Sequence, residues 1–340
     1  MLCSERRWLA EVSSVVLVQS LRDLNSAYRA FFESAAGKRG GARAGAPVFK
    51  TKRDGRQAVR LTTNAFSIRE GGRLYVAKVG ELVVRWCRPL PSVPSSVTVS
   101  RDAADRYWAS FVVDVEPDPL PAIDVECGID LRLTYFAVLS DGSKIASPRF
   151  LRRAERKLKQ AQRELSRKQK GSANWRKARK RVARQHAKVA DRRRDWHHQA
   201  STRIIRENQA VYVEDLAVAA LARSRLAKSV RDAGWTRFVD MLEYKARRYG
   251  REFRKVHRFA PTTRLCSTCG ACGERLGLNV RDWTCRSCGM RHDRDVNAAR
   301  NILALGRRER LNACREDVRP EHALAIFNEA GTDRSEGERK

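Results

Sequence analysis

Four cysteines of this 340-residue chain have the spacing of a metal site. They are Cys266, Cys269, Cys285 and Cys288, in the pattern C-x2-C-x15-C-x2-C. Two such knuckles can place four thiolates around one tetrahedral ion, which is the ligand set of structural zinc. Two disulfides could use the same residues, but the chain opens without a secretory signature. The pattern therefore predicts a zinc ribbon over residues 262–290, with Cys272 as a spare thiol.

Acidic residues follow directly after these cysteines, at the start of an apolar helical pattern. Residues 292–299 read HDRDVNAA, and the apolar positions from Val296 to Leu303 recur at helical spacing. An aspartate at a helix start most often caps the helix, so Asp293 or Asp295 taken alone could be only a cap. Asp295 becomes a candidate catalytic residue if other carboxylates converge on it.

Two further carboxylates close apolar runs that predict buried strands. The run AIDVECGIDL has Asp130 near its end, and the run QAVYVEDL over residues 209–216 has Glu214. Burying a carboxylate is costly unless it is paired or binds a metal. A single aspartate at a strand end is nevertheless more often a turn residue, so each carboxylate is a candidate only as part of a group.

The order of the predicted elements favours such a group. A strand, a hairpin turning at residues 140–142, long helices, a second strand and a further helix are expected in an α/β core of the ribonuclease-H-like class. In that class, acidic residues from separate elements meet at one edge of the sheet. Asp130, Glu214 and Asp295 would then hold two magnesium ions about 4 Å apart, an arrangement suited to phosphodiester hydrolysis.

The charge of the chain predicts a polyanionic partner. Its 70 Lys and Arg against 39 Asp and Glu give a formal net charge of +31, which is extreme for an enzyme acting on small neutral substrates. No apolar run approaches the roughly 18 residues needed to span a bilayer. The remaining cysteines lack framework spacing, which favours a reducing compartment. They are Cys3, Cys87, Cys127, Cys272 and Cys314. We expect a cytoplasmic, nucleoid-associated protein.

Close to half of the excess charge lies in residues 151–199, with 19 Lys and Arg against four Asp and Glu. Sparse helical periodicity, broken at Gly171, predicts a basic two-helix hairpin over residues 150–207. Such helices would condense onto a phosphate backbone, although charge runs are usually only solvated faces. His197 and His198 are interpreted as structural. The candidate nucleic-acid contacts are Arg163, Arg167, Lys168, Lys170, Lys177, Lys180, Arg181 and Arg184.

The first third of the chain predicts a separate module. An amphipathic helix over residues 15–35 has an apolar face expected to pack in the core, and a glycine-rich basic loop over residues 37–57 follows it. Short strands then predict a small antiparallel barrel or sheet that ends at the prolines of residues 117–121. The predicted strands are Phe66–Ile68, Leu74–Val76, Leu82–Trp86, Ser96–Val99 and Tyr107–Val115.

After residue 207 we expect a strand over residues 209–216, a polar stretch over 222–233, a helix over 235–249 and a strand over 252–259. These elements predict six regions. Residues 1–57 form a helical segment and a basic loop, and residues 58–121 form a small β-barrel. The nuclease core with the hairpin covers residues 122–261, the zinc ribbon 262–290, the last helix of the core 291–306, and a largely disordered tail 307–340.

Four motifs in this order resemble the TnpB (OrfB) family of transposon-encoded proteins. They are GIDLRLTYFAVLSDG at 128–142, VYVEDL at 211–216, the paired CxxC knuckles, and HDRDVNAARNIL at 292–303. The resemblance covers most of residues 5–320. It implies an RNA-guided DNA endonuclease with a RuvC-like nuclease core, an inserted zinc ribbon and a basic helical hairpin, preceded by a wedge barrel with a helical insertion.

That resemblance also implies roles for particular residues. Asp130, Glu214 and Asp295 match the catalytic triad, which would bind Mg²⁺, and the four cysteines match the Zn²⁺ ribbon. Residues 58–115 match the barrel that helps to hold the guide RNA and the target DNA. Specificity for double-stranded DNA would then come from base pairing with the guide.

Two departures from the family pattern leave alternatives open. Arg132 stands where members usually have glycine, and a glycine lets backbone approach a metal or phosphate closely. Members also usually begin with a strand and further helices before the helix near Val15, so the chain resembles an N-terminally truncated member. The alternative is a nuclease-impaired relic or guide-dependent repressor. A strand-joining transposase would fit the acidic triad, but not a ribbon placed just before Asp295.

Overall fold

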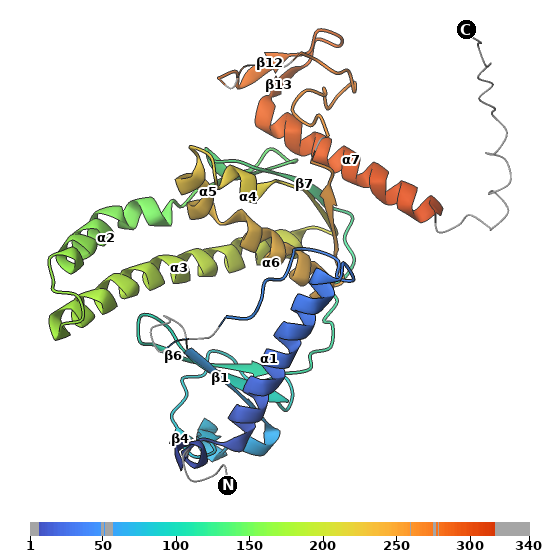
Figure 1. Ribbon diagram of the computed structural model, residues 1–340. Helices are drawn as coiled ribbons and strands as arrows, with labels where there is room; N and C mark the ends of the chain where they lie inside the picture. The colour runs from blue at the N-terminus through green and yellow to red at the C-terminus, as the bar shows by residue number, and fades with distance from the viewer. Residues whose placement is uncertain are drawn as a thin grey trace, which may run out of the picture. The chain divides into compact units, whose positions relative to one another are not determined.

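The computed structural model describes residues 7–48, 51, 57–258, 260–274, 277 and 279–316 of this mixed α/β protein. The chain divides into two compact units (Figure 1). Unit one comprises Met1–Glu116 and Ala154–Asp191, and unit two comprises Pro117–Arg153 and Arg192–Lys340. No helix within the described ranges is both long enough and apolar enough to cross a bilayer.

Unit one contains two antiparallel sheets of three strands each. Their orders are β1-β5-β6 and β2-β3-β4. Both sheets contribute to one apolar core, in which Leu61 of the first sheet packs with Phe66 and Leu74 of the second. The described pairing joins strands within each sheet, and closure into a barrel stays a prediction. The strands are β1 Gln57–Thr62, β2 Phe66–Ile68, β3 Leu74–Val76, β4 Gly80–Leu82, β5 Ser96–Arg101 and β6 Tyr107–Val112.

The prediction of a strand over Leu82–Trp86 is wrong, and the prediction missed β1. The β3–β4 ladder contains only the pairs from Leu74↔Leu82 to Val76↔Gly80. Beyond it, the chain is held by the Trp86 side chain, whose indole N–H donates to the Gly72 carbonyl at 2.7 Å. The Trp86 ring also stacks on Phe111 with 5.2 Å between centroids. Residues 82–86 are therefore held in place by contacts of the Trp86 side chain and not by β-ladder hydrogen bonds.

Helix α1, Ser14–Ala35, buries much less of its apolar face than the sequence predicts. Val15 and Val16 pack on the core of unit one, but Leu21 and Phe32 are 61% and 62% exposed. The six-residue strands beside α1 span about 20 Å at 3.3 Å per residue, whereas the 22-residue helix is about 33 Å long. The sheet is too short to cover the whole helix.

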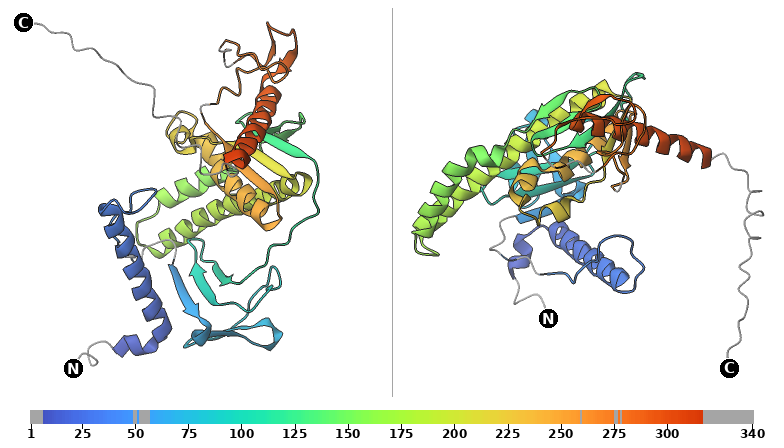
Figure 2. Two further views of the ribbon diagram at one scale, coloured as in Figure 1. Left: turned by 90° about the vertical axis from the view of Figure 1, so that its right-hand side faces the viewer. Right: turned by 90° about the horizontal axis from the view of Figure 1, so that it is seen from above.

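The basic segment forms the predicted hairpin of α2 Phe150–Ser166 and α3 Ala173–Glu207 (Figure 2). Arg181 bridges the two helices through an ion pair with Glu164 at 2.6 Å. Residues 154–191 group with unit one and not, as the sequence division has it, with residues 122–261. Ion pairs of Lys180 with Asp105, and of Asp191 with Arg106 at 2.5 Å, join α3 to the β5–β6 turn.

Unit two is built on a five-stranded sheet of order β11-β10-β7-β8-β9. β7, β8 and β9 form an antiparallel meander, and β10 lies parallel to both β7 and β11. The prediction included four of these strands and missed β9, and β11 ends before the predicted Phe259, which lies outside the described residues. The strands are β7 Glu126–Leu131, β8 Tyr135–Leu139, β9 Lys144–Ala146, β10 Ala210–Glu214 and β11 Glu252–Val256.

Successive side chains along these strands point to opposite faces of the sheet, and helices pack on both faces. On one face, Ile129 and Val211 pack in a core with Ile204 of α3 and with Phe238 of α6, Trp235–Arg248. On the other face, Ala210 and Tyr212 of β10 pack with Ile302 of α7. Helix α7, Arg294–Glu316, lies along β7 on this second face (Figure 1).

Several boundaries in unit two differ from the prediction. The polar stretch 222–233 contains a helix, α5 Ala227–Ala233, which follows the short α4 Val218–Leu221. The predicted last helix 291–306 begins late, because Arg291–Asp293 is a strand, β13, paired with β12 Asp282–Thr284.

Helix α7 also continues beyond residue 306 to Glu316, where the sequence predicts a disordered tail. Arg307 and Arg310 hold this extension through ion pairs with Glu126 at 2.5 and 2.6 Å. The rest of the predicted tail, residues 317–340, lies outside the described residues.

Candidate functional site

Asp130 and Glu214 lie side by side because β7 and β10 are parallel neighbours. Val213 pairs with Ile129, so the next residue on each strand, Glu214 or Asp130, occupies an equivalent position. Both positions fall on the face of the sheet that α7 covers, since side chains alternate along a strand. The parallel pairing thus brings together two carboxylates that are far apart in the sequence.

A close approach of α7 to β7 brings in the third carboxylate. Gly128 lies on the α7 side of β7, and a Cβ atom there would come within 2.2 Å of the Ala299 carbonyl oxygen. Only glycine permits backbone contact at this distance. Asp295, in the first turn of α7, is thereby held beside the end of β7 and is 4% exposed.

The start of α7 separates the capping aspartate from the candidate catalytic one. The Asp293 carboxylate accepts hydrogen bonds from the backbone N–H groups of Asp295 and Val296 at 2.9 and 3.0 Å. Asp293 also forms an ion pair with Lys144 of β9 at 2.5 Å. Asp293 is therefore the cap, and the Asp295 side chain is left to face Asp130.

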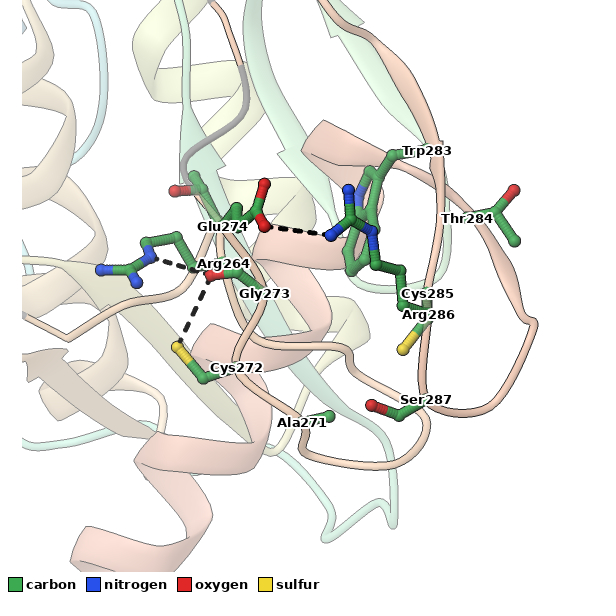
Figure 3. Close-up of a pocket in the computed structure, with 11 residues that line it drawn as sticks. Arg264, Ala271, Cys272, Gly273, Glu274, Trp283, Thr284, Cys285, Arg286 and Ser287 are labelled. Atoms are coloured by element: carbon green, nitrogen blue, oxygen red, sulfur yellow. Dashed lines mark hydrogen bonds and ion pairs between the residues drawn. The ribbon is translucent and has the colours of Figure 1, made fainter.

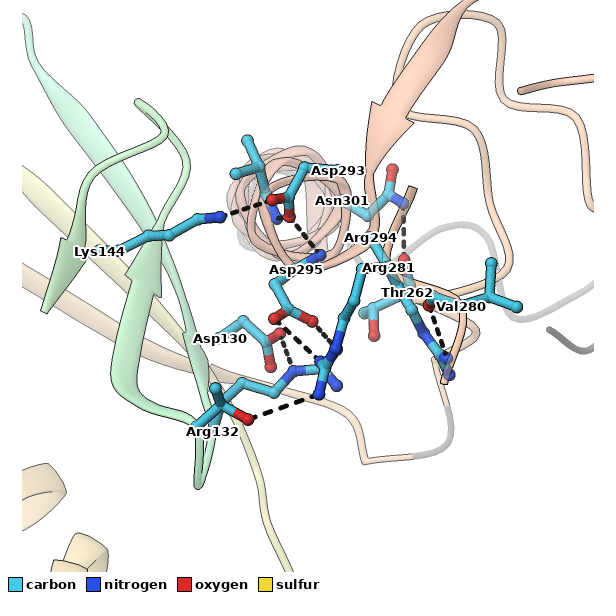
Figure 4. Close-up of polar contacts among 12 residues, drawn as sticks. Asp130, Arg132, Lys144, Thr262, Val280, Arg281, Asp293, Arg294, Asp295 and Asn301 are labelled. Carbon is cyan, nitrogen blue, oxygen red and sulfur yellow. Dashed lines mark hydrogen bonds and ion pairs between the residues drawn. The ribbon is translucent and has the colours of Figure 1, made fainter. Parts of the chain in front are cut away.

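Arg132 lies between two of these carboxylates (Figure 4). Its Nε donates to Asp130 Oδ2 at 2.6 Å, and its Nη2 lies 3.2 Å from Asp295 Oδ1. A second guanidinium approaches from the ribbon, where Arg281 Nη1 lies 3.4 Å from Asp295 Oδ2. The sequence points to Arg132 only by comparison with the family pattern, and gives no signal for Arg281.

Burial and repulsion from neighbouring carboxylates disfavour the charged forms of Asp130 and Glu214. Burial raises the pKa of Asp130 to about 6, with Asp295 adding to the rise and Arg132 opposing it. Burial also raises the pKa of Glu214 to about 7, and the negative charge of Asp130 contributes. Like charges that share a buried site behave in this way when cationic charge is insufficient.

The chemistry of this donor set fits a hard divalent cation, although among the described residues only the four cysteines already lie close enough together to share one ion. The donor set offers carboxylate oxygens from three residues, which are the ligands that Mg²⁺ prefers. Asp295 Oδ1 is buried and accepts no hydrogen bond of good geometry within the described part of the chain, where it forms an ion pair with Arg132 at 3.2 Å. The carboxylates of Asp130, Glu214 and Asp295 could therefore hold such an ion, provided that Arg132 leaves room for it.

The four cysteines form a second cluster with the geometry of a tetrahedral site. Their sulfur atoms all lie within 4.8 Å of one another. The Sγ–Sγ distances of Cys266 to Cys288 and of Cys269 to Cys285 are both 3.7 Å. A tetrahedron with metal–sulfur bonds of about 2.3 Å has edges of about 3.8 Å. The predicted pairing of the knuckles therefore suits one metal ion.

Local backbone shapes the two knuckles and favours the thiolate form of Cys285. Gly270 and Gly289 follow the knuckles with φ of +75° and +71°, which allows their N–H groups to close each turn on Cys266 and Cys285. Backbone N–H groups of Cys288 and Ser287 lower the pKa of the Cys285 thiol to about 6. Thiolate is the form that binds metal.

Cys272 lies apart from this cluster, as the sequence predicts. Its thiol is directed at the carbonyl of Gly273, with sulfur and oxygen 3.9 Å apart (Figure 3). It lines a shallow pocket on the ribbon together with Arg264 and Trp283, and an ion pair of Arg286 with Glu274 at 3.0 Å closes one side. Cys285 of the four-cysteine cluster also lines this pocket, whereas Cys272 is not one of the four.

Two asparagines join the cysteine knuckle to the helix that carries Asp295. Asn297 accepts a hydrogen bond from the Ser267 N–H at 2.9 Å and donates to the Leu265 carbonyl at 2.7 Å. Asn301, one turn later, donates to the carbonyls of Thr262 and Leu265 at 2.7 Å. The sequence analysis missed this role, although two asparagines four residues apart in an apolar helix are a usable signal.

Most of the predicted nucleic-acid contacts are exposed on α2, α3 and the turn between them. Lys180 is half-buried and its ammonium pairs with Asp105, while Arg181 pairs with Glu164. The other predicted contacts are exposed, and they are Arg163, Arg167, Lys168, Lys170, Lys177 and Arg184. Further along α3, His197 is buried against the Ala233 carbonyl, 2.9 Å away, and burial lowers its pKa to about 4. His197 is therefore structural, as predicted.

Known proteins resemble this chain over almost its whole length. A protein of Streptomyces pristinaespiralis named "Putative RNA-guided DNA endonuclease" is 46% identical over 321 residues, covering 93% of this chain and 77% of that protein. A second, InsQ of Escherichia coli K12, carries the same description and is 31% identical, covering 93% of this chain and 79% of its own. A family model described as "Probable transposase" (OrfB) matches residues 110–225, and a "Cas12f1-like, TNB domain" model matches residues 235–302.

The chain belongs to the TnpB (OrfB) family. Among solved structures, a Cas12f1–sgRNA–target DNA complex aligns with this TnpB-family chain at a TM-score of 0.47 and 15% identity. That alignment covers 72% of this chain and 59% of the Cas12f1 chain, so this chain spans less than two thirds of that structure's length.

Proposed function

We propose that this chain is a transposon-associated, RNA-guided DNA endonuclease whose RuvC-like core hydrolyses phosphodiester bonds with the help of Mg²⁺. The proposal is supported by the equivalent positions of Asp130 and Glu214 on neighbouring parallel strands, and by the pairing of Arg132 with both Asp130 and Asp295. The descriptions of the Streptomyces and Escherichia relatives support the guided-nuclease class. The particular triad and the metal dependence are our inference from the geometry.

Each carboxylate would act through its position on a rigid element. Asp130 and Glu214 are held by neighbouring parallel strands, and Asp295 by a capped helix that packs directly on β7. Mg²⁺ bound there would supply activation of water and stabilisation of the leaving oxygen. Because the carboxylates are buried, their charges would act in a medium that screens them weakly.

The exposed basic residues of the α2–α3 hairpin support guide RNA and target DNA as partners. Phosphate contacts of this kind are sequence-independent, which suits a protein whose specificity comes from a base-paired guide. The net charge of +31 is consistent with a long nucleic-acid contact surface. We also propose that the four-cysteine cluster binds Zn²⁺ and keeps the ribbon folded.

Guided cleavage tests the proposal. The chain would be purified together with RNA from its own locus and given a plasmid library in Mg²⁺, beside Asp130→Ala and Asp295→Ala. We expect cutting by the unaltered chain, loss of cutting by at least 1000-fold in both variants, and RNA binding within a few-fold of the original. Cutting by either variant at the original rate would refute the triad.

A nuclease-impaired RNA- and DNA-binding protein is the second candidate. The observation that favours it is the ion pair of Arg132 with Asp130, which places a side chain inside the carboxylate cluster. Such a protein would bind its guide and target in the same assay but leave the plasmid library uncut.

A further inference from the structure

The Arg132 side chain places a positive charge beside the carboxylates of the cluster. Its guanidinium forms ion pairs with both Asp130 and Asp295, at 2.6 and 3.2 Å. The Arg132 side chain is 23% exposed, and the two aspartate side chains are 5% and 6% exposed. An arginine cannot lose its proton under ordinary conditions, so this charge is permanent.

The position of Arg132 matters more than its charge. A divalent ion shared by Asp130 and Asp295 would need oxygens of both, and the guanidinium already pairs with Asp130 Oδ2 and Asp295 Oδ1 (Figure 4). Two positive charges at the same oxygens would also repel each other strongly in this buried setting. Occupation by Arg132 and occupation by a metal ion therefore exclude one another.

Arg281 provides a contrast at the same cluster. It also pairs with Asp295, but at 3.4 Å, on the other oxygen, and with a side chain that is 51% exposed. Its second Nη contacts Thr134 Oγ1, so it lies at the rim. Losing Arg281 would leave the space between Asp130 and Asp295 as it is.

The Arg132 side chain can be removed without altering the turn that carries it. The Arg132 N–H closes the β7–β8 turn on the Phe136 carbonyl at 3.3 Å, and any residue other than proline keeps this bond. Its φ is not positive, so neither glycine nor a larger residue is required there. A substitution at 132 therefore tests the guanidinium and not the turn.

We propose that Arg132 is an internal counter-ion that competes with divalent metal for the carboxylate cluster and must swing out before the metal binds. The proposal rests on the proposed function only in taking these carboxylates as the metal site. It predicts that the unaltered chain binds metal more weakly than a chain with the same carboxylates but without the Arg132 side chain. It also predicts that bound metal can replace Arg132 in stabilising the fold.

The test measures Mn²⁺ binding to the full chain, free of RNA, by electron paramagnetic resonance. Arg132→Gly should bind Mn²⁺ at least tenfold more tightly than the unaltered chain, and Arg281→Gly should stay within threefold of it. Adding Asp130→Ala to Arg132→Gly should abolish the gain, which places the ion at this cluster. Equal affinity of Arg132→Gly and the unaltered chain would overturn the proposal.

Thermal unfolding gives a second readout that a merely structural ion pair would not produce. Without metal, Arg132→Gly should melt below the unaltered chain, because the buried aspartates lose their counter-ion. Mg²⁺ should restore its melting temperature while changing that of the unaltered chain little. A loss that Mg²⁺ does not repair would show that Arg132 only stabilises the fold. If Arg132→Gly does not fold, Arg132→Gln retains hydrogen bonding without the charge and serves in both measurements.

The two proposals can fail separately. Tighter Mn²⁺ binding by Arg132→Gly without guided cutting by any variant would support the competition and refute the nuclease. Guided cutting by the unaltered chain with equal Mn²⁺ affinities would do the reverse.

Discussion

The cysteine cluster and the proposed carboxylate site differ in how far apart in the sequence their residues lie. The four cysteines lie within residues 266–288, and each knuckle is shaped by its own turn. The three carboxylates come from residues 130, 214 and 295, and meet only because β7 pairs with β10 and α7 packs on β7. The first site is local and the second depends on the whole of unit two.

The two clusters should also differ in which substitutions disrupt them. Nearby backbone N–H groups lower the pKa of the Cys285 thiol, which favours the form that binds metal. Burial and repulsion instead raise the pKa of Asp130 and Glu214, which disfavours their charged forms, and Arg132 opposes both rises. A local site should therefore fail when one ligand is lost, whereas the dispersed site should fail when the packing between elements changes.

The largest effect is expected from removing a cysteine ligand. Cys285→Ser should reduce the zinc content of the purified chain from one ion to none and unfold the ribbon, because structural zinc supplies much of the folding free energy of such modules. Atomic absorption gives the zinc content. Cys272→Ser is the matched control and should keep its zinc; unchanged zinc in Cys285→Ser would remove that residue from the ligand set.

The next effect tests the dispersed site through packing alone. Gly128→Ala should lower the free energy of unfolding by about 3 kcal/mol, because its methyl group would overlap the α7 backbone. Displacing α7 should also separate Asp295 from Asp130 and reduce guided cleavage at least tenfold. Urea unfolding measures the first quantity. Gly45→Ala, at a position with nothing within 4 Å and no positive φ, should cost far less, and equal losses would argue against the close-contact explanation.

A smaller effect should show that the two sites are connected. Asn297→Ala removes the bonds to Ser267 and Leu265, so its cost should be about 1 to 3 kcal/mol for the buried groups left unpaired. Zinc should then be released at a lower chelator concentration than from the unaltered chain. Zinc retention equal to that of the unaltered chain would mean that α7 and the ribbon are energetically independent.

The smallest effect concerns the hairpin, which carries neither cluster. Lys177→Ala should weaken RNA binding a few-fold and lower the slope of log affinity against log salt by about 1, because one phosphate contact is lost. Lys180→Ala is a matched change on the same helix, but its ammonium is already paired with Asp105, so its slope should change less. Filter binding at several salt concentrations measures both slopes.

Much of the local structure could be predicted from the sequence. The cysteine pairing, the strand–hairpin–helices–strand order of unit two and the bounds of β2, β3 and β8 follow from short-range patterns. The errors arise where a long-range contact overrides the pattern. Residues 82–86 look like a strand but are held by Trp86, and α7 outlasts its apolar pattern because Arg307 and Arg310 reach Glu126.

The sequence by itself determined which residues could do chemistry, since thiol and carboxylate spacing along the chain is a property of the chain. Only the tertiary structure decided which of them meet, and that Arg132 lies between Asp130 and Asp295. The physical reason is that the period of a strand or helix sets the face a side chain occupies, whereas the pairing of strands and the approach of α7 at Gly128 set what that face meets.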